Sequence, residues 1–124
     1  TALEPVEALR VLTRYGNPDV AVLANARAVY PMGVITGEYD YPLPEEIEAM
    51  LKKLSAKSWM IDATSAAVAL GNPVLSNIVM IGALAGASLL PIDRRAFEEE
   101  VTKSIPHDKR PINLAAFDAG RKMI

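Results

Sequence analysis

The sequence predicts an α/β fold in which a small parallel sheet is followed by a mostly helical C-terminal half. Residues 20–24 form a short apolar run bounded by turn residues, which is typical of a buried parallel strand. Residues 58–61 have the same character. An amphipathic helix between the two runs completes a β–α–β unit, which is almost always right-handed. So few strands predict that further strands lie outside this chain or in a partner.

Size and composition favour a single domain over residues 1–124, since this length is typical of one domain. Lys and Arg number 13 against 15 Asp and Glu, which gives a net charge of −2 and argues against nucleic-acid binding. The chain has no Cys and one His, so it lacks the ligands of an iron–sulfur cluster or a Cys/His metal site. We therefore expect no catalytic residue and no metal site in this chain.

The N-terminus resembles neither a signal peptide nor a Met start, which predicts a processed or truncated piece. Residues 63–92 carry no charge, and residues 74–90 reach the lower length limit of a membrane span. Gly82 and Gly86 also form the G-x-x-x-G spacing of membrane helix pairs. The break at residues 71–73 favours a buried helix without a membrane instead. A membrane-associated helical protein is the alternative.

The N-terminal half predicts two helices around the first strand. Pro5 suits the first turn of a helix that ends at residues 16–18. Residues 29–36 form a weaker extended run that Pro31 and Gly33 interrupt. A helix then begins at Pro44, with one apolar face made of Ile47, Met50, Leu51 and Leu54.

The C-terminal half predicts four helices. Asp62 suits the N-cap of a short helix that ends near Gly71. Residues 73–89 form the central helix, whose glycines Gly82 and Gly86 predict close contact with another backbone, because glycine otherwise destabilises a helix. Two further helices follow, capped by Asp93 and opened by Pro111.

Four residues are candidates for ligand binding. Asn25 and Arg27 follow the first strand, where open parallel sheets bind ligands, and Arg27 suits a phosphate or carboxylate. An exposed turn is the favoured alternative. Asn72 and Asn77 lie at the start of the central helix, where free N–H groups attract anions. Holding the preceding loop is the favoured alternative for Asn77, whose amide needs a partner if it is buried.

Other polar residues predict ordinary surface roles. His107 lies in a charged loop without a second metal ligand, and residues 98–100 are three glutamates typical of a solvated helix face. The Pro-containing region 29–44 is long for a connection in a compact domain, which favours a functional or interface role. We interpret it as a protein contact surface carrying Tyr30, Met32, Tyr39 and Tyr41.

One stretch resembles a known family. Residues 70–73 (Leu-Gly-Asn-Pro) with 77–84 (Asn-Ile-Val-Met-Ile-Gly-Ala-Leu) resemble a recurring stretch in the gamma module of 2-oxoacid:ferredoxin oxidoreductases. Residues 2–10, residues 25–27 and the Pro31–Val34 region are also similar, most of all to the beta subunit of the indolepyruvate branch. The resemblance covers essentially the whole chain. It corresponds to the C-terminal part of the module, because the family's Gly-rich N-terminal half is absent here.

The resemblance implies a Rossmann-like fold and an accessory role in the thiamine-dependent oxidative decarboxylation of aryl pyruvates to acyl-CoA, with electrons passed to ferredoxin. Thiamine diphosphate, iron–sulfur clusters and CoA are then cofactors of the complex and not of this chain. The implied partners are the larger thiamine and iron–sulfur subunit and the missing N-terminal half of the module, in the cytoplasm, with a homodimer possible. The chain alone is expected to be inactive. The alternative is a free-standing CoA- or nucleotide-binding α/β domain.

Overall fold

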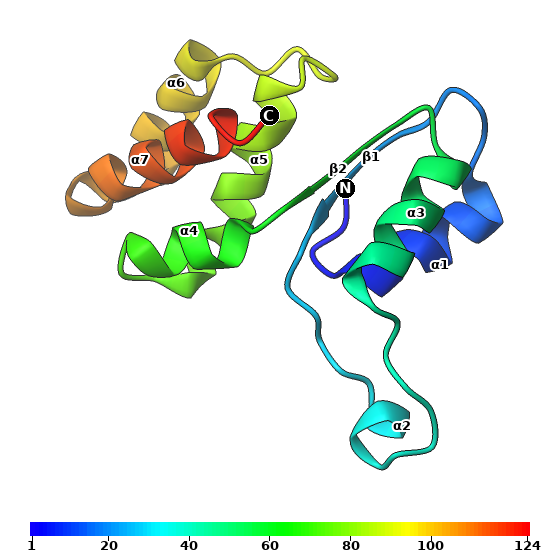
Figure 1. Ribbon diagram of the computed structural model, residues 1–124. Helices are drawn as coiled ribbons and strands as arrows, with labels where there is room; N and C mark the ends of the chain where they lie inside the picture. The colour runs from blue at the N-terminus through cyan, green and yellow to red at the C-terminus, as the bar shows by residue number, and fades with distance from the viewer. The chain divides into compact units, whose positions relative to one another are not determined.

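A computed structural model describes all 124 residues, and its contacts fall into two compact units, residues 1–60 and 61–124. The chain contains seven α-helices and one two-stranded parallel sheet (Figure 1). The predicted α/β class, with a parallel sheet and a helical C-terminal half, is confirmed. A single domain over residues 1–124 stays a prediction, and each unit is described by itself below.

The first unit is a sheet with two helices on one face. Its strands are β1 (Ala21–Asn25) and β2 (Lys57–Ile61, whose last residue begins the second unit). Helices α1 (Pro5–Tyr15) and α3 (Pro44–Leu54) cover the same face of the sheet (Figure 1). Alternate residues of a strand share a face, so the β1 side chains pointing to these helices complete a core made of Ala8, Leu12, Val22, Ala24, Ile47 and Leu51.

Helices α1 and α3 begin at Pro5 and Pro44, as predicted from the sequence. At α1, the Glu4 carboxylate accepts the Glu7 N–H at 2.8 Å, and Pro5 occupies the first turn, where its missing N–H is not needed. At α3, the Glu46 carboxylate accepts the Leu43 N–H at 2.9 Å, directly before Pro44. Acidic side chains in the first turn also oppose the positive end of each helix dipole.

The sheet has a third contributor that the sequence patterns did not indicate. Ala2 forms a parallel bridge with Ala24: its N–H donates to Leu23 at 2.9 Å, and its carbonyl accepts the Asn25 N–H at 2.9 Å. On the other side of β1, the carbonyl of Val20 accepts the Ala56 N–H at 2.8 Å. Strand β1 is therefore central, with backbone partners on both edges.

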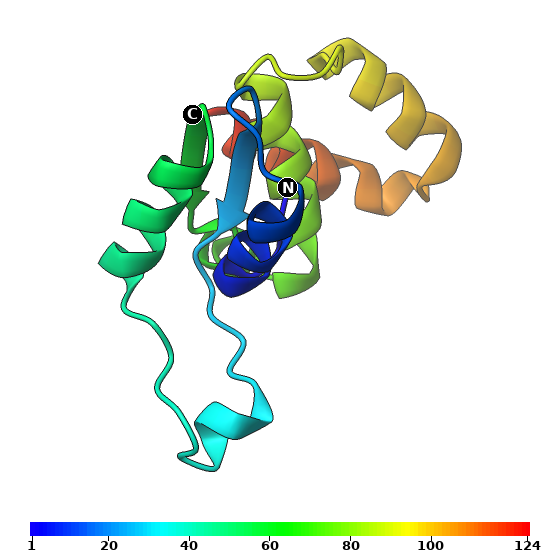
Figure 2. The ribbon, with the colours of Figure 1, turned by 90° about the vertical axis from the view of Figure 1, so that its right-hand side faces the viewer.

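The predicted extended run at residues 29–36 is wrong. The segment instead contains the single-turn helix α2 (Met32–Ile35). Pro31 is the cause, because it has no N–H for a sheet ladder while its carbonyl accepts the Val34 and Ile35 N–H groups at 3.0 and 3.2 Å. Both views show the connection between β1 and α3 extending away from α1 and α3 (Figures 1 and 2).

The second unit is entirely helical after the end of β2. The helix predicted over residues 73–89 is confirmed in kind but is shorter, because a 3₁₀ turn precedes it and Ser88 adopts a left-handed φ of 55° after it. None of the helices combines the length and apolar character that crossing a bilayer requires. The elements are α4 (Ala63–Ala69), η1 (Pro73–Leu75), α5 (Ser76–Gly86), α6 (Arg94–Ser104), η2 (His107–Lys109) and α7 (Arg110–Arg121).

Helices α5 and α7 touch backbone to backbone. A Cβ added at Gly82 would lie 2.0 Å from the Phe117 carbonyl oxygen, and one at Gly120 would lie 1.9 Å from the Val79 carbonyl oxygen. Further along α5, a Cβ at Gly86 would lie 2.9 Å from the Arg121 carbonyl oxygen. The close approach predicted at Gly82 and Gly86 is therefore confirmed, since no side chain fits between the helices at Gly82 without displacing backbone.

Replacing Gly82 by Ala tests this contact, because the sign of the change in the free energy of unfolding separates two opposite expectations. Helix propensity alone predicts a gain of about 1 kcal/mol. Overpacking against the Phe117 carbonyl predicts a loss of about 1–3 kcal/mol, and we expect this loss in urea unfolding followed by circular dichroism. Gly86→Ala is the graded comparison, with a smaller loss because its Cβ has more room. A Gly82→Ala chain more stable than wild type would contradict the close packing.

Candidate functional site

Asn25 has a structural position at the carboxyl end of β1. The residue is only 3% exposed, and its amide nitrogen Nδ2 donates to the Leu3 carbonyl at 3.3 Å. Its backbone N–H donates to Ala2. Asn25 therefore joins the N-terminal residues to the central strand through both its backbone and its side chain, as a buried amide requires.

Arg27 lies two residues beyond the end of β1 and is exposed. Its guanidinium makes no hydrogen bond and no ion pair within the chain, so it is free to meet an anion from outside. It lines none of the cavities described below. This placement matches the exposed turn favoured from the sequence, and ligand binding by Asn25 and Arg27 stays a prediction.

Asn72 and Asn77 lie in the second unit, so the structure does not join them with Asn25 and Arg27 in one describable site. The Asn72 amide oxygen accepts the Val74 N–H at 3.0 Å and caps η1. The Asn77 side chain is exposed, and its oxygen accepts the Ile78 N–H at 2.8 Å. The expected tie from Asn77 to the preceding loop is therefore wrong, because its partner lies in α5. Ligand binding by the pair stays a prediction.

An apolar cavity of about 190 Å³ lies at the carboxyl end of β1. The chain just after β1 and the first turns of α1 and α3 surround it. Tyr30 and Tyr41 meet edge to face, with ring centroids 5.1 Å apart, and form part of its wall. The cavity is smaller than the 300–1,000 Å³ typical of small-molecule pockets. Its lining is Pro5, Ala26, Ala28, Tyr30, Tyr41, Pro42, Leu43, Pro44, Ile47 and Met60.

Sequence reasoning missed the partner of Tyr41. The Tyr41 hydroxyl donates to the Glu4 carboxylate, whose other oxygen accepts the Glu7 N–H. Burial, followed by the hydrogen bond to Glu4, raises the pKa of Tyr41 well above its usual value. A second cavity of about 300 Å³ lies beside this pair. The local signal was present, because a carboxylate directly before Pro5 has the pattern of a helix cap. The hydrogen bond to Tyr41 was not predictable, because Tyr41 lies 37 residues from Glu4 in the sequence.

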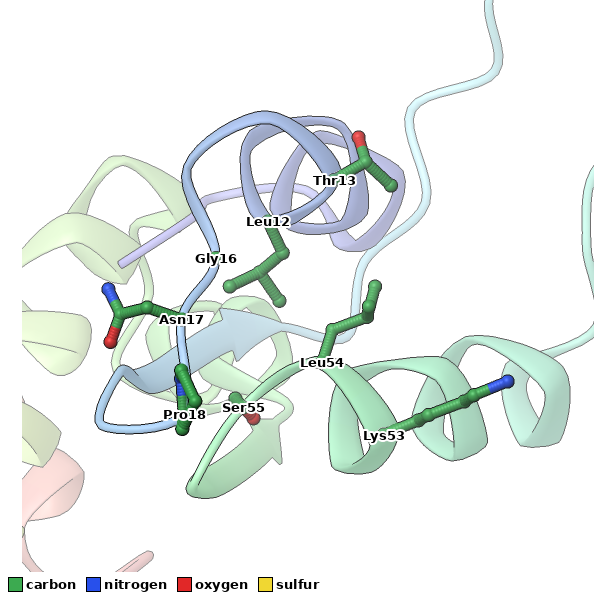
Figure 3. A pocket seen from close by; sticks show the side chains of 8 residues that line it. All are labelled: Leu12, Thr13, Gly16, Asn17, Pro18, Lys53, Leu54 and Ser55. Carbon is green, nitrogen blue, oxygen red and sulfur yellow. The ribbon is translucent and has the colours of Figure 1, made fainter.

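A more open groove of about 430 Å³ lies between the C-terminal ends of α1 and α3. Leu12 and Leu54 point into the space between the helices, whereas Lys53 points away from the turn at Gly16–Pro18 (Figure 3). The Ser55 hydroxyl is already bonded to the Leu51 carbonyl at 2.6 Å. The groove therefore offers apolar contact but no convergent set of free polar groups.

Several other charged residues of the second unit support its helices. Asp62 caps α4 by accepting the Ser65 N–H at 2.9 Å, and hydrogen bonds from Ser65 lower the pKa of the Asp62 carboxyl. In α6, Glu98 pairs with Arg94 at 2.9 Å and Glu99 pairs with Arg95 at 3.0 Å. The partners are four residues apart, and the exposed side chains of Glu98 and Glu99 agree with the solvated face predicted for residues 98–100.

The cofactors that the resemblance implies do not fit this chain's own side chains. An iron–sulfur cluster needs thiolate ligands in nearly all cases, and the sequence has no Cys. A diphosphate-bound divalent cation needs clustered carboxylates, and no group of three or more His, Cys, Asp or Glu side chains in the 124 residues is arranged to hold a metal ion. The chain therefore supplies contact surfaces and small apolar cavities, and we derive no chemical step through these groups.

Comparison with known proteins identifies the family. The model of the pyruvate ferredoxin/flavodoxin oxidoreductase family matches residues 1–123. The chain belongs to this family. This match confirms the family resemblance described from the sequence motifs, and the relatives that follow confirm the resemblance to the indolepyruvate branch. No solved structure matches this family member significantly.

The curated relatives of this oxidoreductase-family chain are named as subunits. Indolepyruvate oxidoreductase subunit IorB of Pyrococcus horikoshii is 34% identical over 122 residues, which cover 98% of this chain and 60% of the relative. The IorB of Archaeoglobus fulgidus is 30% identical over 119 residues, 96% and 59% of the two chains. The 2-oxoglutarate synthase subunit KorC of Methanothermobacter thermautotrophicus is 31% identical over 116 residues, 87% and 61%. The chain thus spans about 60% of the length of these relatives.

The Tyr41–Glu4 pair predicts a dependence of stability on alkaline pH. Because folding raises the Tyr41 pKa, this group stabilises the fold fully below the unfolded tyrosine value of about 10 and loses that effect as the pH rises through the folded pKa. Tyr41→Phe should lower the free energy of unfolding by about 1 kcal/mol at neutral pH. It should also remove part of the decline from about pH 10 upward.

Thermal melts across this pH range measure both effects. Tyr15→Phe is the control, because Tyr15 is exposed and donates no hydrogen bond. The same alkaline decline in Tyr41→Phe as in wild type would show that the Tyr41 hydroxyl is not held by Glu4.

Proposed function

We propose that this chain is an accessory, non-catalytic module of a 2-oxoacid:ferredoxin oxidoreductase, most closely of the indolepyruvate type. The family match over residues 1–123 is the observation that carries the proposal. Two kinds of relative support it, because IorB is named as a subunit of an indolepyruvate oxidoreductase and KorC as a subunit of a 2-oxoglutarate synthase. Between the two, four IorB relatives against two KorC relatives favour indolepyruvate over 2-oxoglutarate.

The reaction that we assign to the complex is the oxidative decarboxylation of an aryl pyruvate to an acyl-CoA, with two electrons passed to ferredoxin. Thiamine diphosphate and the iron–sulfur clusters belong in this proposal to a larger partner subunit, because the side chains here do not fit them. The Gly-rich half of the module is a second proposed partner, and the proposed location is the cytoplasm. The work of this chain is then to bind and position those partners.

A free-standing CoA- or nucleotide-binding domain is the alternative, and the geometry favours it less. The cavity at the end of β1 holds about 190 Å³, which is small for a nucleotide. Arg27, the natural phosphate ligand, does not line it. The polar oxygens of Asn72 and Asn77 already accept backbone N–H groups.

Reconstitution with the larger subunit tests the accessory role. We expect the purified chain alone to reduce no ferredoxin when supplied with indolepyruvate, CoA and thiamine diphosphate. We expect the co-purified complex to do so, and to prefer indolepyruvate over 2-oxoglutarate. The control is the larger subunit without this chain. Ferredoxin reduction by the chain alone would contradict the proposal, as would a larger subunit that never co-purifies with it.

A calorimetric titration with CoA and ATP tests the alternative. We expect no saturable heat of binding with the wild-type chain, because the cavity at the end of β1 is small for either ligand and Arg27 does not line it. Arg27→Ala is the matched variant. Saturable binding that Arg27→Ala abolishes would favour a free-standing binding domain and would overturn our preference.

A further inference from the structure

One segment of the first unit concentrates exposed apolar side chains. We call residues 29–43, which connect β1 to α3 and contain α2, the tip segment (Figures 1 and 2). Isolated apolar side chains are ordinary on a protein surface, but six of the chain's sixteen exposed large apolar side chains fall within these fifteen residues. They are Val29, Tyr30, Met32, Ile35, Tyr39 and Leu43.

The end of the tip segment is closed by its own contacts. The Glu38 N–H donates to the Gly33 carbonyl at 2.8 Å, and Gly37 makes the turn with a left-handed φ of 77°. The Tyr39 ring packs so closely on Gly33 that a Cβ there would lie 2.2 Å from the ring. The Thr36 hydroxyl donates to the Met32 carbonyl at 3.1 Å. The tip is therefore preformed, which lowers the entropy lost when a partner binds it.

The base of the tip segment is anchored to α1. The Tyr41 hydroxyl donates to Glu4, the residue that caps α1, and the Tyr30 ring packs edge-on against the Tyr41 ring at 5.1 Å. Two tyrosines thus fix where the segment leaves the helices. Met32 and Ile35, in the single turn of α2, remain 71% and 68% exposed. The anchoring orders the segment without covering its apolar side chains.

Charge limits what this surface can bind. The tip segment contains two carboxylates and no Lys or Arg. Glu38 and Asp40, inside the tip segment, form none of the ion pairs of the chain. A two-fold contact between copies would set this surface against itself and oppose like charges. A partner surface with Lys or Arg around an apolar groove fits both the charge and the exposed side chains.

We propose that the tip segment is the element by which this chain docks on the larger oxidoreductase subunit, in an apolar groove rimmed by basic side chains. The inference rests on the proposed function, which supplies that partner. Met32, Ile35 and Tyr39 are the anchors, since methionine and aromatic side chains are enriched in the buried centre of interfaces. Glu38 and Asp40 meet the basic rim and guide association.

The apolar part of the proposal is tested with Met32→Ser/Ile35→Ser. The control is Val68→Ser/Val74→Ser in the second unit, where Val74 is 72% exposed. Binding is measured between each purified chain and the purified larger subunit. We expect the dissociation constant to rise at least about 30-fold for the tip variant and less than about threefold for the control. Both variants should melt at the wild-type temperature, since the replaced side chains are exposed.

The electrostatic part is tested with Asp40→Lys. Asp108→Lys is the matched control, because Asp108 is also exposed and unpaired but lies in η2. We expect Asp40→Lys to slow association about tenfold at low salt and to flatten its salt dependence, while Asp108→Lys leaves both unchanged. Equal effects of the two substitutions would contradict the proposal that basic side chains surround the partner's groove.

The outcomes separate the two proposals. Wild-type chain that does not bind the larger subunit overturns the accessory role and the docking inference with it. Wild-type binding that the tip variant retains, or that the control variant loses equally, overturns the docking inference alone. Self-association of the wild-type chain that the tip variant abolishes would assign the segment to a second copy instead. Selective loss of binding in the tip variant supports the inference.

Discussion

The Glu4 carboxylate joins the separate parts of the first unit. One oxygen accepts the Glu7 N–H where α1 begins, and the other accepts the Tyr41 hydroxyl where the tip segment returns to the body. The neighbouring Ala2 pairs with the edge of β1 that β2 leaves free. One short stretch therefore sets a helix start, a sheet edge and the base of a protrusion. Because a charged acceptor strengthens a hydrogen bond, the Tyr41 contact helps to hold the long connection in place.

The second unit depends on a different constraint, which is the absence of side chains at Gly82 and Gly120. Their carbonyl neighbours on the opposite helix leave no room for a Cβ, so α5 and α7 pack at backbone distance. Helix α6 packs on α7 through the stacked rings of Phe97 and Phe117, whose centroids are 4.2 Å apart. The guanidinium of Arg94 also donates a hydrogen bond to the Asp118 carboxylate at 2.7 Å. Each unit thus has stabilising contacts of its own.

The sequence predicted those parts of the fold that local chemistry decides. Helix starts at Pro5, Pro44, Asp62 and Asp93 were predictable because caps and first-turn prolines act within three or four residues. The close contact at Gly82 was predictable because a helical glycine is costly unless its lack of a side chain is used. The strands followed from short apolar runs with β-branched residues.

The features that failed or were missed all depend on distant partners. Tyr41 and Glu4 lie 37 residues apart, and nothing near either residue identifies the other. The pairing of Ala2 with β1 spans a whole helix. At α2, the apolar residues predicted an extended run, but the Pro31 carbonyl accepts the Val34 and Ile35 N–H groups and starts a helical turn. For the candidate site, the positions of Asn25 and Arg27 were predictable from the strand, whereas the burial of Asn25 depends on the N-terminal segment.

The distribution of polar and apolar groups supports the proposal that this chain acts as a binding module. Catalysis requires titratable groups that converge on one point. Here they are dispersed among helix caps and exposed ion pairs, as at Asp62 and Arg94. Exposed apolar side chains are instead concentrated at the tip segment. Exposing Met32 and Ile35 to water costs hydrophobic free energy, which is recovered when another surface covers them. The entropy lost on binding is small when the segment is already ordered, because a partner then gains the buried area without ordering the loop.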